Sequence, residues 1–114
     1  NEETLPLVLR TGCWAGHSIY PSSKMDEARM AALVQRYGSA RIIINSAADW
    51  GISDPLKVPK TVAVMRAVGI TEDAIETIVW RNPLAFFAQS GRLTLDDAPA
   101  AGESSFEGNS VRRG

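Results

Sequence analysis

The side chains best suited to chemistry lie in two short polar segments, each of which follows an apolar stretch of the sequence. Together these segments contain Tyr20, Lys24, Asn45, Ser46, Asp49, Trp50 and Asp54. Asp49 follows a β-branched run, and a carboxylate in such a place can bind a metal ion or take a proton. Without further support, the favoured interpretation of Asp49 is a capping residue that accepts from the N–H groups of the turn at Trp50 to Ile52. Tyr20, Lys24 and Trp50 are candidates for substrate contact, with rim packing or solvation as the alternative.

Two further residues have reactive side chains without a partner at a suitable spacing. His17 is the one histidine of the chain and lies in an apolar stretch, so we interpret it as a structural histidine with satisfied hydrogen bonds. Cys13 is the one cysteine, which excludes an internal disulfide. We interpret Cys13 as a buried structural thiol.

Composition excludes several classes of protein. The 114 residues carry 12 Lys and Arg against 13 Asp and Glu, so no basic face for nucleic acid is indicated. No apolar run approaches the roughly 20 residues of a membrane span, and we expect a cytoplasmic protein. The chain opens with Asn1 rather than Met, and its Asn-Glu-Glu-Thr start is typical of a helix within a longer protein.

The polar segments must be positioned by the elements that precede them. Residues 14–20 and 42–44 are predicted strands, and a helix from Asp26 to Gly38 joins them. Asp26 is the expected N-cap and Gly38 the expected left-handed C-cap. A connection of this length between two strands predicts that they run parallel. The expected buried side of the helix is Met30, Leu33, Val34 and Tyr37.

The remaining elements are expected to be helices. A short one precedes residue 12, and another opens at Pro59 and buries Val62, Met65 and Val68. A third is capped by Thr71, buries Ile75, Ile78 and Val79, and is broken at Asn82 and Pro83. Asn82 then caps a last helix, with Leu84 and Phe87 as its buried pair. Residues 93–114 lose all periodicity and are expected to form a flexible tail.

Isoleucines 42–44 form a run without polar alternation, which is typical of a strand buried on both faces of a parallel sheet. Such strands need neighbours on both edges. A parallel β/α barrel, typically of about 250 residues, supplies these neighbours and carries its chemistry on the loops after the strands. We therefore expect an α/β fold in which residues 1–92 form about the last three β/α units of a TIM-type barrel, with the rest of the barrel missing upstream.

Several stretches of the sequence resemble the last third of TatD-related hydrolases, which belong to the amidohydrolase superfamily. The stretches are WAGHSIYP (14–21), Lys24 with its helix, RIIINSAADWG (41–51), SDP (53–55) and NPLAFF (82–87). The resemblance covers about residues 1–92 and rests on the order and spacing of these stretches together. It implies that they run from helix six through helix eight of a β/α barrel.

The resemblance also implies a site. In that family one or two divalent metals, such as zinc, manganese or magnesium, are held by a His-x-His pair, by further ligands on middle strands, and by an Asp at the end of strand eight. Asp49 matches this last position, which implies that it binds metal and takes a proton from the metal-bound water. TatD nucleases commonly have Glu-Thr-Asp where this chain has Ala47-Ala48-Asp49, which argues against nuclease activity. Cleavage of an ester, phosphoester or amide in a small-molecule substrate remains the expectation.

The isolated chain is expected to be inactive, because a metal site needs about three or four ligands and this chain offers one or two. Two other functions remain open on the sequence. One is a different barrel enzyme, of the isomerase or aldolase type, that uses Asp49 without metal. The other is a helix-rich interaction module without catalysis.

Overall fold

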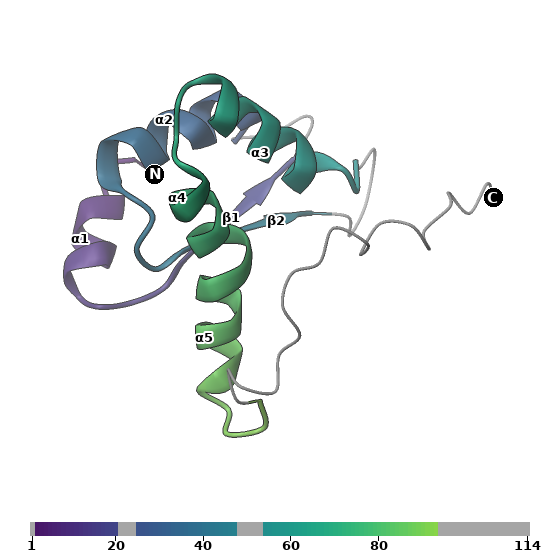
Figure 1. Cartoon of the computed structure of the whole chain (residues 1–114). Coiled ribbons are helices and arrows are strands. Elements are labelled where there is room, and N and C mark those ends of the chain that lie inside the picture. Colours follow the sequence, from purple (N-terminus) through teal and green to yellow (C-terminus); the bar gives the residue numbers. More distant parts are fainter. Residues whose placement is uncertain (1, 21–24, 48–53, 94–114) are drawn as a thin grey trace, which may run out of the picture.

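The computed structural model describes residues 2–20, 25–47 and 54–93. Strands β1 (Ala15–Ile19) and β2 (Ile42–Ser46) pair in parallel, with Ala15 opposite Ile42 and Ile19 opposite Ser46. Helix α2 (Glu27–Tyr37) connects them and lies against the sheet (Figure 1). The predicted order of strand, helix and strand, and the parallel pairing, are confirmed. The tail predicted at 93–114 lies, but for its first residue, outside the described residues.

Both residues predicted to cap α2 do so. The Asp26 carboxylate accepts a hydrogen bond from the backbone N–H of Arg29 at 2.8 Å, which satisfies one of the free donors of the first turn. Gly38 is the C-cap, at φ 83° and ψ −172°, a positive-φ conformation that glycine adopts without strain but that lies outside the αL region. On the sheet side, Met30, Leu33 and Val34 are buried as expected, and Tyr37 is half-buried.

Five further helical segments surround this unit (Figure 1). They are α1 (Leu5–Arg10), α3 (Lys57–Ala67), α4 (Glu72–Glu76), the π-helical turn η1 (Thr77–Arg81) and α5 (Asn82–Ala88). Helix α3 packs beside α2, while η1 and α5 reach the start of β2. As predicted, the Thr71 hydroxyl caps α4 by accepting from the backbone N–H of Ala74.

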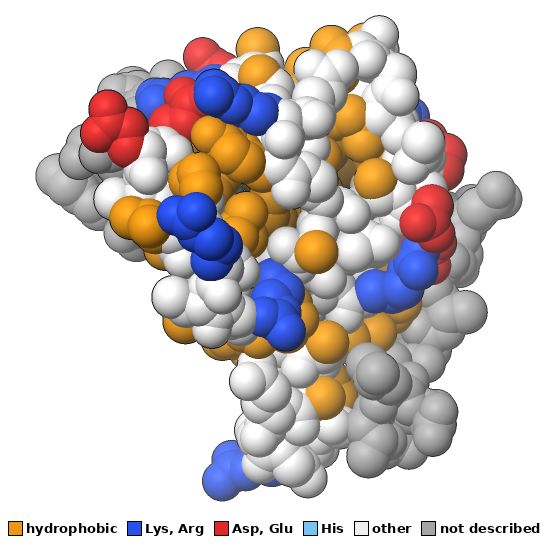
Figure 2. Space-filling model, turned by 90° about the vertical axis from the view of Figure 1, so that its left-hand side faces the viewer, with side chains coloured by type: hydrophobic (Ala, Val, Ile, Leu, Met, Phe, Trp, Pro, Cys, Tyr) orange, Lys and Arg blue, Asp and Glu red, His pale blue; other side chains and the backbone are white. Residues whose placement is uncertain are grey.

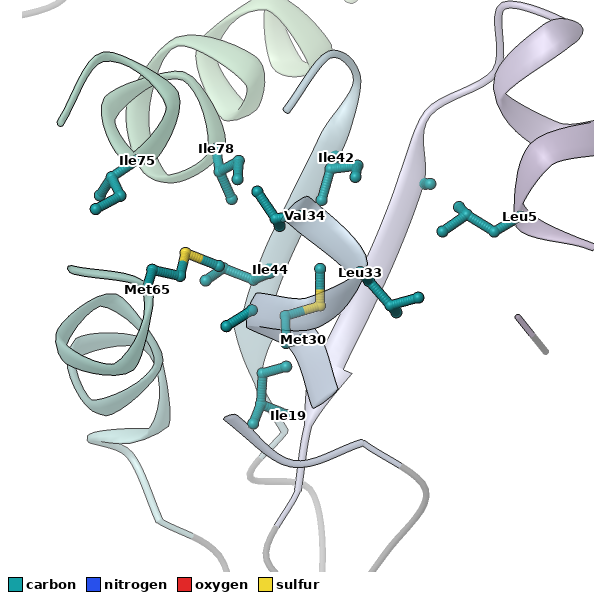
Figure 3. Close-up of a cluster of buried hydrophobic side chains, with 12 residues drawn as sticks. Leu5, Ile19, Met30, Leu33, Val34, Ile42, Ile44, Met65, Ile75 and Ile78 are labelled. Atoms are coloured by element: carbon teal, nitrogen blue, oxygen red, sulfur yellow. The ribbon is translucent and has the colours of Figure 1, made fainter. Parts of the chain in front are cut away.

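The core lies between the sheet and these helices. Its fully buried side chains include Ile19 and Ile42 from the strands, Met30 from α2, Met65 from α3 and Ile78 from η1 (Figure 3). Side chains of five separate elements thus meet in one cluster. Leu5 belongs to the same buried cluster and points from α1 toward β1 (Figure 3).

The predicted helix break at Asn82 and Pro83 is wrong. The chain widens into a π-helical turn, and the Asn82 N–H bonds to the Thr77 carbonyl oxygen five residues back. Helix α5 follows this turn without interruption at Asn82, and its second residue is Pro83, which has no N–H to donate. The expected buried pair of α5 is also wrong, because Leu84 is half-buried and Phe87 is 62% exposed.

Helix α3 departs from prediction in its start and in its buried face. It begins at Lys57, two residues before Pro59. Val68 is exposed, and Thr61 instead lies fully buried beside Met65. Burial of the Thr61 hydroxyl is tolerated because it donates to the Lys57 carbonyl oxygen at 2.7 Å.

The sheet is covered on one face by the described helices. On the other face Gly16, Ser18 and Asn45 are exposed and Ile43 is half-buried. The run 42–44 was predicted to be buried on both faces of the sheet. Within residues 2–20, 25–47 and 54–93, nothing buries the second face of β2 completely. Since a two-stranded parallel unit occurs in many α/β folds, the barrel remains a prediction.

Candidate functional site

The carboxyl ends of the two strands lie side by side. Ile19, the last residue of β1, is the register partner of Ser46, the last residue of β2. Tyr20 follows β1, is half-buried, and donates its backbone N–H to the Met25 carbonyl oxygen at 3.3 Å. The two polar segments of the sequence therefore leave the sheet at the same end, beyond the carboxyl ends of its strands.

Of the predicted site residues, Tyr20 is the one that the structure describes. Asp49, Lys24 and Trp50 lie outside the described residues, so their roles remain predictions. Their flanking residues are described on both sides. Met25 follows Lys24 directly, while Ala47 and Asp54 bracket the segment that contains Asp49 and Trp50.

The end of β2 is tied to the start of α3. The Ser46 hydroxyl donates to the Pro55 carbonyl oxygen at 3.4 Å. Asp54 accepts from the backbone N–H of Leu56 at 2.9 Å and forms an ion pair with Lys60. The Lys60 hydrogen bond is the main reason that the pKa of Asp54 is lowered, with the Leu56 N–H second. Asp54 thus acts as a charged turn residue that stabilises the return of the chain from the candidate site.

A second ion pair joins α2 to α3. Lys57 Nζ lies 2.7 Å from Glu27 Oε1, and the two side chains are 14% and 19% exposed. The hydrogen bond from Lys57 lowers the pKa of Glu27. Both residues lie in the first turns of their helices, and their contact connects the segments after β1 and after β2. The sequence offers no reason to pair Glu27 with Lys57, because the two residues are 30 positions apart.

His17 differs from its predicted state. Its Nε2 atom is buried and finds no hydrogen-bond partner among the described residues, so it is not a satisfied structural histidine. Burial is the main cause that lowers the pKa of His17 from its ordinary value of 6.5. The imidazole lines a cavity of about 470 Å³ together with Glu2, Leu5, Gly16, Ser18, Met25, Arg29 and Leu33.

The cysteine prediction is wrong as well. Cys13 is exposed, because it belongs to the four-residue connection between α1 and β1 rather than to the strand. Beside this connection, Arg41 approaches Gly12, which adopts a left-handed φ of 77°. A Cβ at position 12 would lie 2.5 Å from Arg41 Nη1, the end of a long side chain that can move aside, so it is the positive φ that favours glycine there.

Metal binding receives no support from the part of the chain that is described. Among residues 2–20, 25–47 and 54–93, no three His, Cys, Asp or Glu side chains are grouped so that they could hold an ion. The described side chains therefore do not fit a complete metal centre. Any site of the expected kind would depend on Asp49 and on ligands supplied from elsewhere.

Comparison with known proteins yields no relative. No protein-family model matches the chain, and neither a curated protein nor a solved structure matches it. Within the described residues, every helix is too short or too polar for a membrane-spanning segment.

Proposed function

We propose that this chain is the C-terminal part of a TatD-like β/α-barrel hydrolase, and that Asp49 supplies one carboxylate to its catalytic site. The observation that carries the proposal is the parallel pairing of β1 and β2 with their carboxyl ends in register. The sequence continues from those ends into the segments that contain Lys24 and Asp49.

Parallel α/β folds concentrate ligand-binding and catalytic groups at the carboxyl ends of their strands. Helices and hydrogen bonds hold the strands rigidly, and the loops beyond the strand ends are free to vary in sequence. Tyr20 and Ser46 mark these ends in the structure. We assign substrate contact to Tyr20, Lys24 and Trp50, and catalysis to Asp49, which follows Ser46 by three residues in the sequence.

Two ion pairs in the segments that follow the strands support the same assignment. Glu27 with Lys57 joins the helices that follow the two strands, and Asp54 with Lys60 holds the start of α3. Their carboxylates are engaged by lysine, which leaves them poorly suited to bind a substrate or an ion. Of the carboxylates of Glu27, Asp54 and Asp49, we therefore assign the chemistry to Asp49.

The proposal gives this chain one metal ligand and no more. No metal-binding group is found among residues 2–20, 25–47 and 54–93, and the proposal places the other ligands on the remaining strands of the barrel, outside these 114 residues. The bond to be cleaved is an ester, phosphoester or amide in a small molecule. The net charge of −1 at pH 7 offers no electrostatic support for a nucleic-acid substrate.

The test replaces Asp49 by Asn in the protein expressed from its whole reading frame. We expect hydrolysis of a panel of aryl ester, phosphodiester and amide substrates to fall at least about 100-fold, as is typical when an acid–base group is removed. Asp73→Asn is the matched control. Asp73 pairs with Arg81 on the surface and is 81% exposed, so its loss should leave turnover unchanged.

Two results would contradict the proposal. Equal turnover in the Asp49→Asn variant and the wild type would remove Asp49 from the mechanism. If the protein does not hydrolyse these substrates but converts isomerase or aldolase substrates, and keeps that activity after exhaustive dialysis against a chelator, a metal-free barrel enzyme would be favoured.

A further inference from the structure

The cavity of about 470 Å³ that His17 lines lies between α1 and α2, over residues 16–18 of β1. Leu5 from α1 and Leu33 from α2 give it apolar walls, and Met25 adds a flexible apolar side chain. Its volume falls in the range of small-molecule sites, which are concave, mostly apolar and provided with a few polar groups. Tyr20, the described residue of the proposed catalytic site, does not line this cavity.

The imidazole of His17 is the polar group on the sheet side of the cavity. His17 shares with Ala15 and Ile19 the face of β1 that the helices cover, because alternate residues of a strand point the same way. Burial lowers the pKa of His17, so the ring is neutral at pH 7 and carries one proton. Since Nε2 is buried, Nδ1 is the ring nitrogen left for a ligand. A hydroxyl group suits it, because a hydroxyl both donates and accepts hydrogen bonds.

Two opposite charges line the same cavity. Glu2 precedes α1, and Arg29 belongs to α2. A second hollow, of about 430 Å³, shares both residues and continues to Pro6, Arg36 and Tyr37. Figure 2 views the side of the molecule that carries α1 and shows acidic and basic side chains next to one another, beside hydrophobic ones. Glu2 and Arg29 therefore form a charged boundary between the two hollows.

Both charged groups can bind a ligand in addition to their present contacts. Glu2 Oε1 lies 3.1 Å from Arg36 Nη1, but the Arg36 side chain is 69% exposed, and so exposed an ion pair is weak and can rearrange. A carboxylate accepts several hydrogen bonds, and the Arg29 guanidinium has five N–H donors. A ligand with an ammonium and a carboxylate therefore meets a complementary group on each helical side, whereas a singly charged ligand leaves one charge unmatched.

We propose that this cavity binds a free α-amino acid whose large apolar side chain ends in a hydroxyl, as in tyrosine. The ammonium of the ligand faces Glu2, and its carboxylate faces Arg29. Its ring packs against Leu5 and Leu33, and its hydroxyl reaches His17. The inference does not depend on the proposed function, because it concerns binding at a second site and not hydrolysis.

Four ligands that differ by one group test the chemistry. Isothermal titration calorimetry of the protein expressed from its whole reading frame compares L-tyrosine with three analogues. Tyramine lacks the carboxylate, 3-(4-hydroxyphenyl)propionate lacks the ammonium, and L-phenylalanine lacks the hydroxyl. We expect the first two to bind at least about tenfold more weakly than L-tyrosine, because each loses a charge-assisted hydrogen bond, and L-phenylalanine to bind a few-fold more weakly.

The analogues also define the results that contradict the inference. If L-tyrosine does not bind, the inference is overturned. If tyramine or the propionate binds as tightly as L-tyrosine, the cavity does not recognise a zwitterion, and the proposed ligand class is wrong.

Two arginine variants locate the ligand. Arg29→Gln should weaken binding of L-tyrosine at least about tenfold and leave binding of tyramine, which has no carboxylate, unchanged. Arg10→Gln is the matched control, because Arg10 is also an exposed helical arginine but does not line the cavity. Both side chains are exposed, so both variants should unfold at the wild-type urea concentration. Wild-type affinity for L-tyrosine in Arg29→Gln would place the ligand elsewhere.

Variants of the other two polar groups give independent results. Glu2→Gln should weaken binding of L-tyrosine but not of the propionate, which has no ammonium. His17→Phe keeps a ring of similar size and removes the nitrogens, so it should abolish the preference for L-tyrosine over L-phenylalanine. A preference that persists in His17→Phe would overturn the hydroxyl contact, and equal weakening of both ligands by Glu2→Gln would overturn the ammonium contact.

Binding and catalysis give separate answers. Binding of L-tyrosine by a protein without hydrolase activity would support this site and contradict the proposed function. Hydrolase activity in a protein that does not bind L-tyrosine would do the reverse.

Discussion

The side-chain amide of Asn82 donates to the carbonyl oxygen of Ile42 at 2.8 Å, across 40 positions of sequence. The same nitrogen donates to the Ser39 carbonyl oxygen at 2.7 Å. Asn82 is 8% exposed and begins α5, so one buried carboxamide joins that helix to the start of β2. Without it, the Ile42 carbonyl group would lose this donor, whereas the Ser39 carbonyl oxygen would keep the Ile42 N–H at 3.3 Å.

Replacement of Asn82 by Leu should therefore destabilise the protein by about 1–3 kcal/mol, the cost of leaving buried polar groups unpaired. Urea unfolding of the 114-residue chain measures this loss. Gln89→Leu is the control, because the Gln89 carboxamide donates to the Phe86 carbonyl oxygen at an exposed position. If both variants unfold at the wild-type urea concentration, the Asn82 contact does not stabilise the fold.

Stability should also depend on pH through His17. Burial lowers the pKa of His17 in the folded state, so the unfolded state binds a proton first as the pH falls. The contribution of the neutral imidazole is complete above the unfolded pKa of about 6.5 and is lost as the pH falls below it. Unfolding midpoints should decrease between pH 7.5 and pH 5.5. Because the sequence has one histidine, His17→Gln should remove most of that slope. An equal slope in the variant would show that His17 titrates normally.

The Glu27–Lys57 ion pair should contribute a measurable coupling energy. Both side chains are largely buried, so we expect about 1 kcal/mol in a double-mutant cycle of Glu27→Gln and Lys57→Met, at the upper end for such pairs. Glu2 with Arg36 is the matched pair, at 3.1 Å but 40% and 69% exposed, and should couple much more weakly. Equal couplings would mean that burial does not strengthen the first pair.

Acid should weaken the Glu27–Lys57 pair. The pKa of Glu27 is lowered in the folded state, so its contribution is present above its ordinary value of 4.5 and is lost as the pH falls through the folded pKa. The coupling measured at pH 7 should therefore shrink at pH 3. A coupling that is unchanged at pH 3 would contradict this assignment.

Cys13 should react as an exposed thiol. A chain with one cysteine should release one equivalent of chromophore from Ellman's reagent under native conditions, without denaturant. Absorbance at native pH, compared with the same protein in guanidinium, measures the accessible fraction. A thiol that reacts after unfolding but not before would restore the buried assignment.

Metal content separates the chain from the proposed complete enzyme. The purified 114-residue chain should retain no stoichiometric zinc or manganese, because one carboxylate is too few ligands for tight binding. Elemental analysis of the chain beside the protein from its whole reading frame provides the comparison. Stoichiometric metal in the 114-residue chain would show that it carries a site of its own.

Local patterns in the sequence were sufficient for much of the fold. The parallel strands and their connecting helix follow from apolar periodicity, and the caps at Asp26, Gly38 and Thr71 follow from residue types that act within one turn. Sequence also singled out Asp49, Lys24 and Trp50, which lie outside the described residues. Of the candidate site, the structure describes Tyr20 and the strand ends from which both segments depart.

Other features depended on residues that are distant in the chain. Asn82 was expected to end a helix, but its carboxamide is buried because Ser39 and Ile42 offer carbonyl groups across the fold. Glu27 meets Lys57 only because α2 and α3 pack side by side. Periodicity shows that a residue faces inward, but not what it faces there, since hydrogen-bond partners and exposed edges are set by packing between elements.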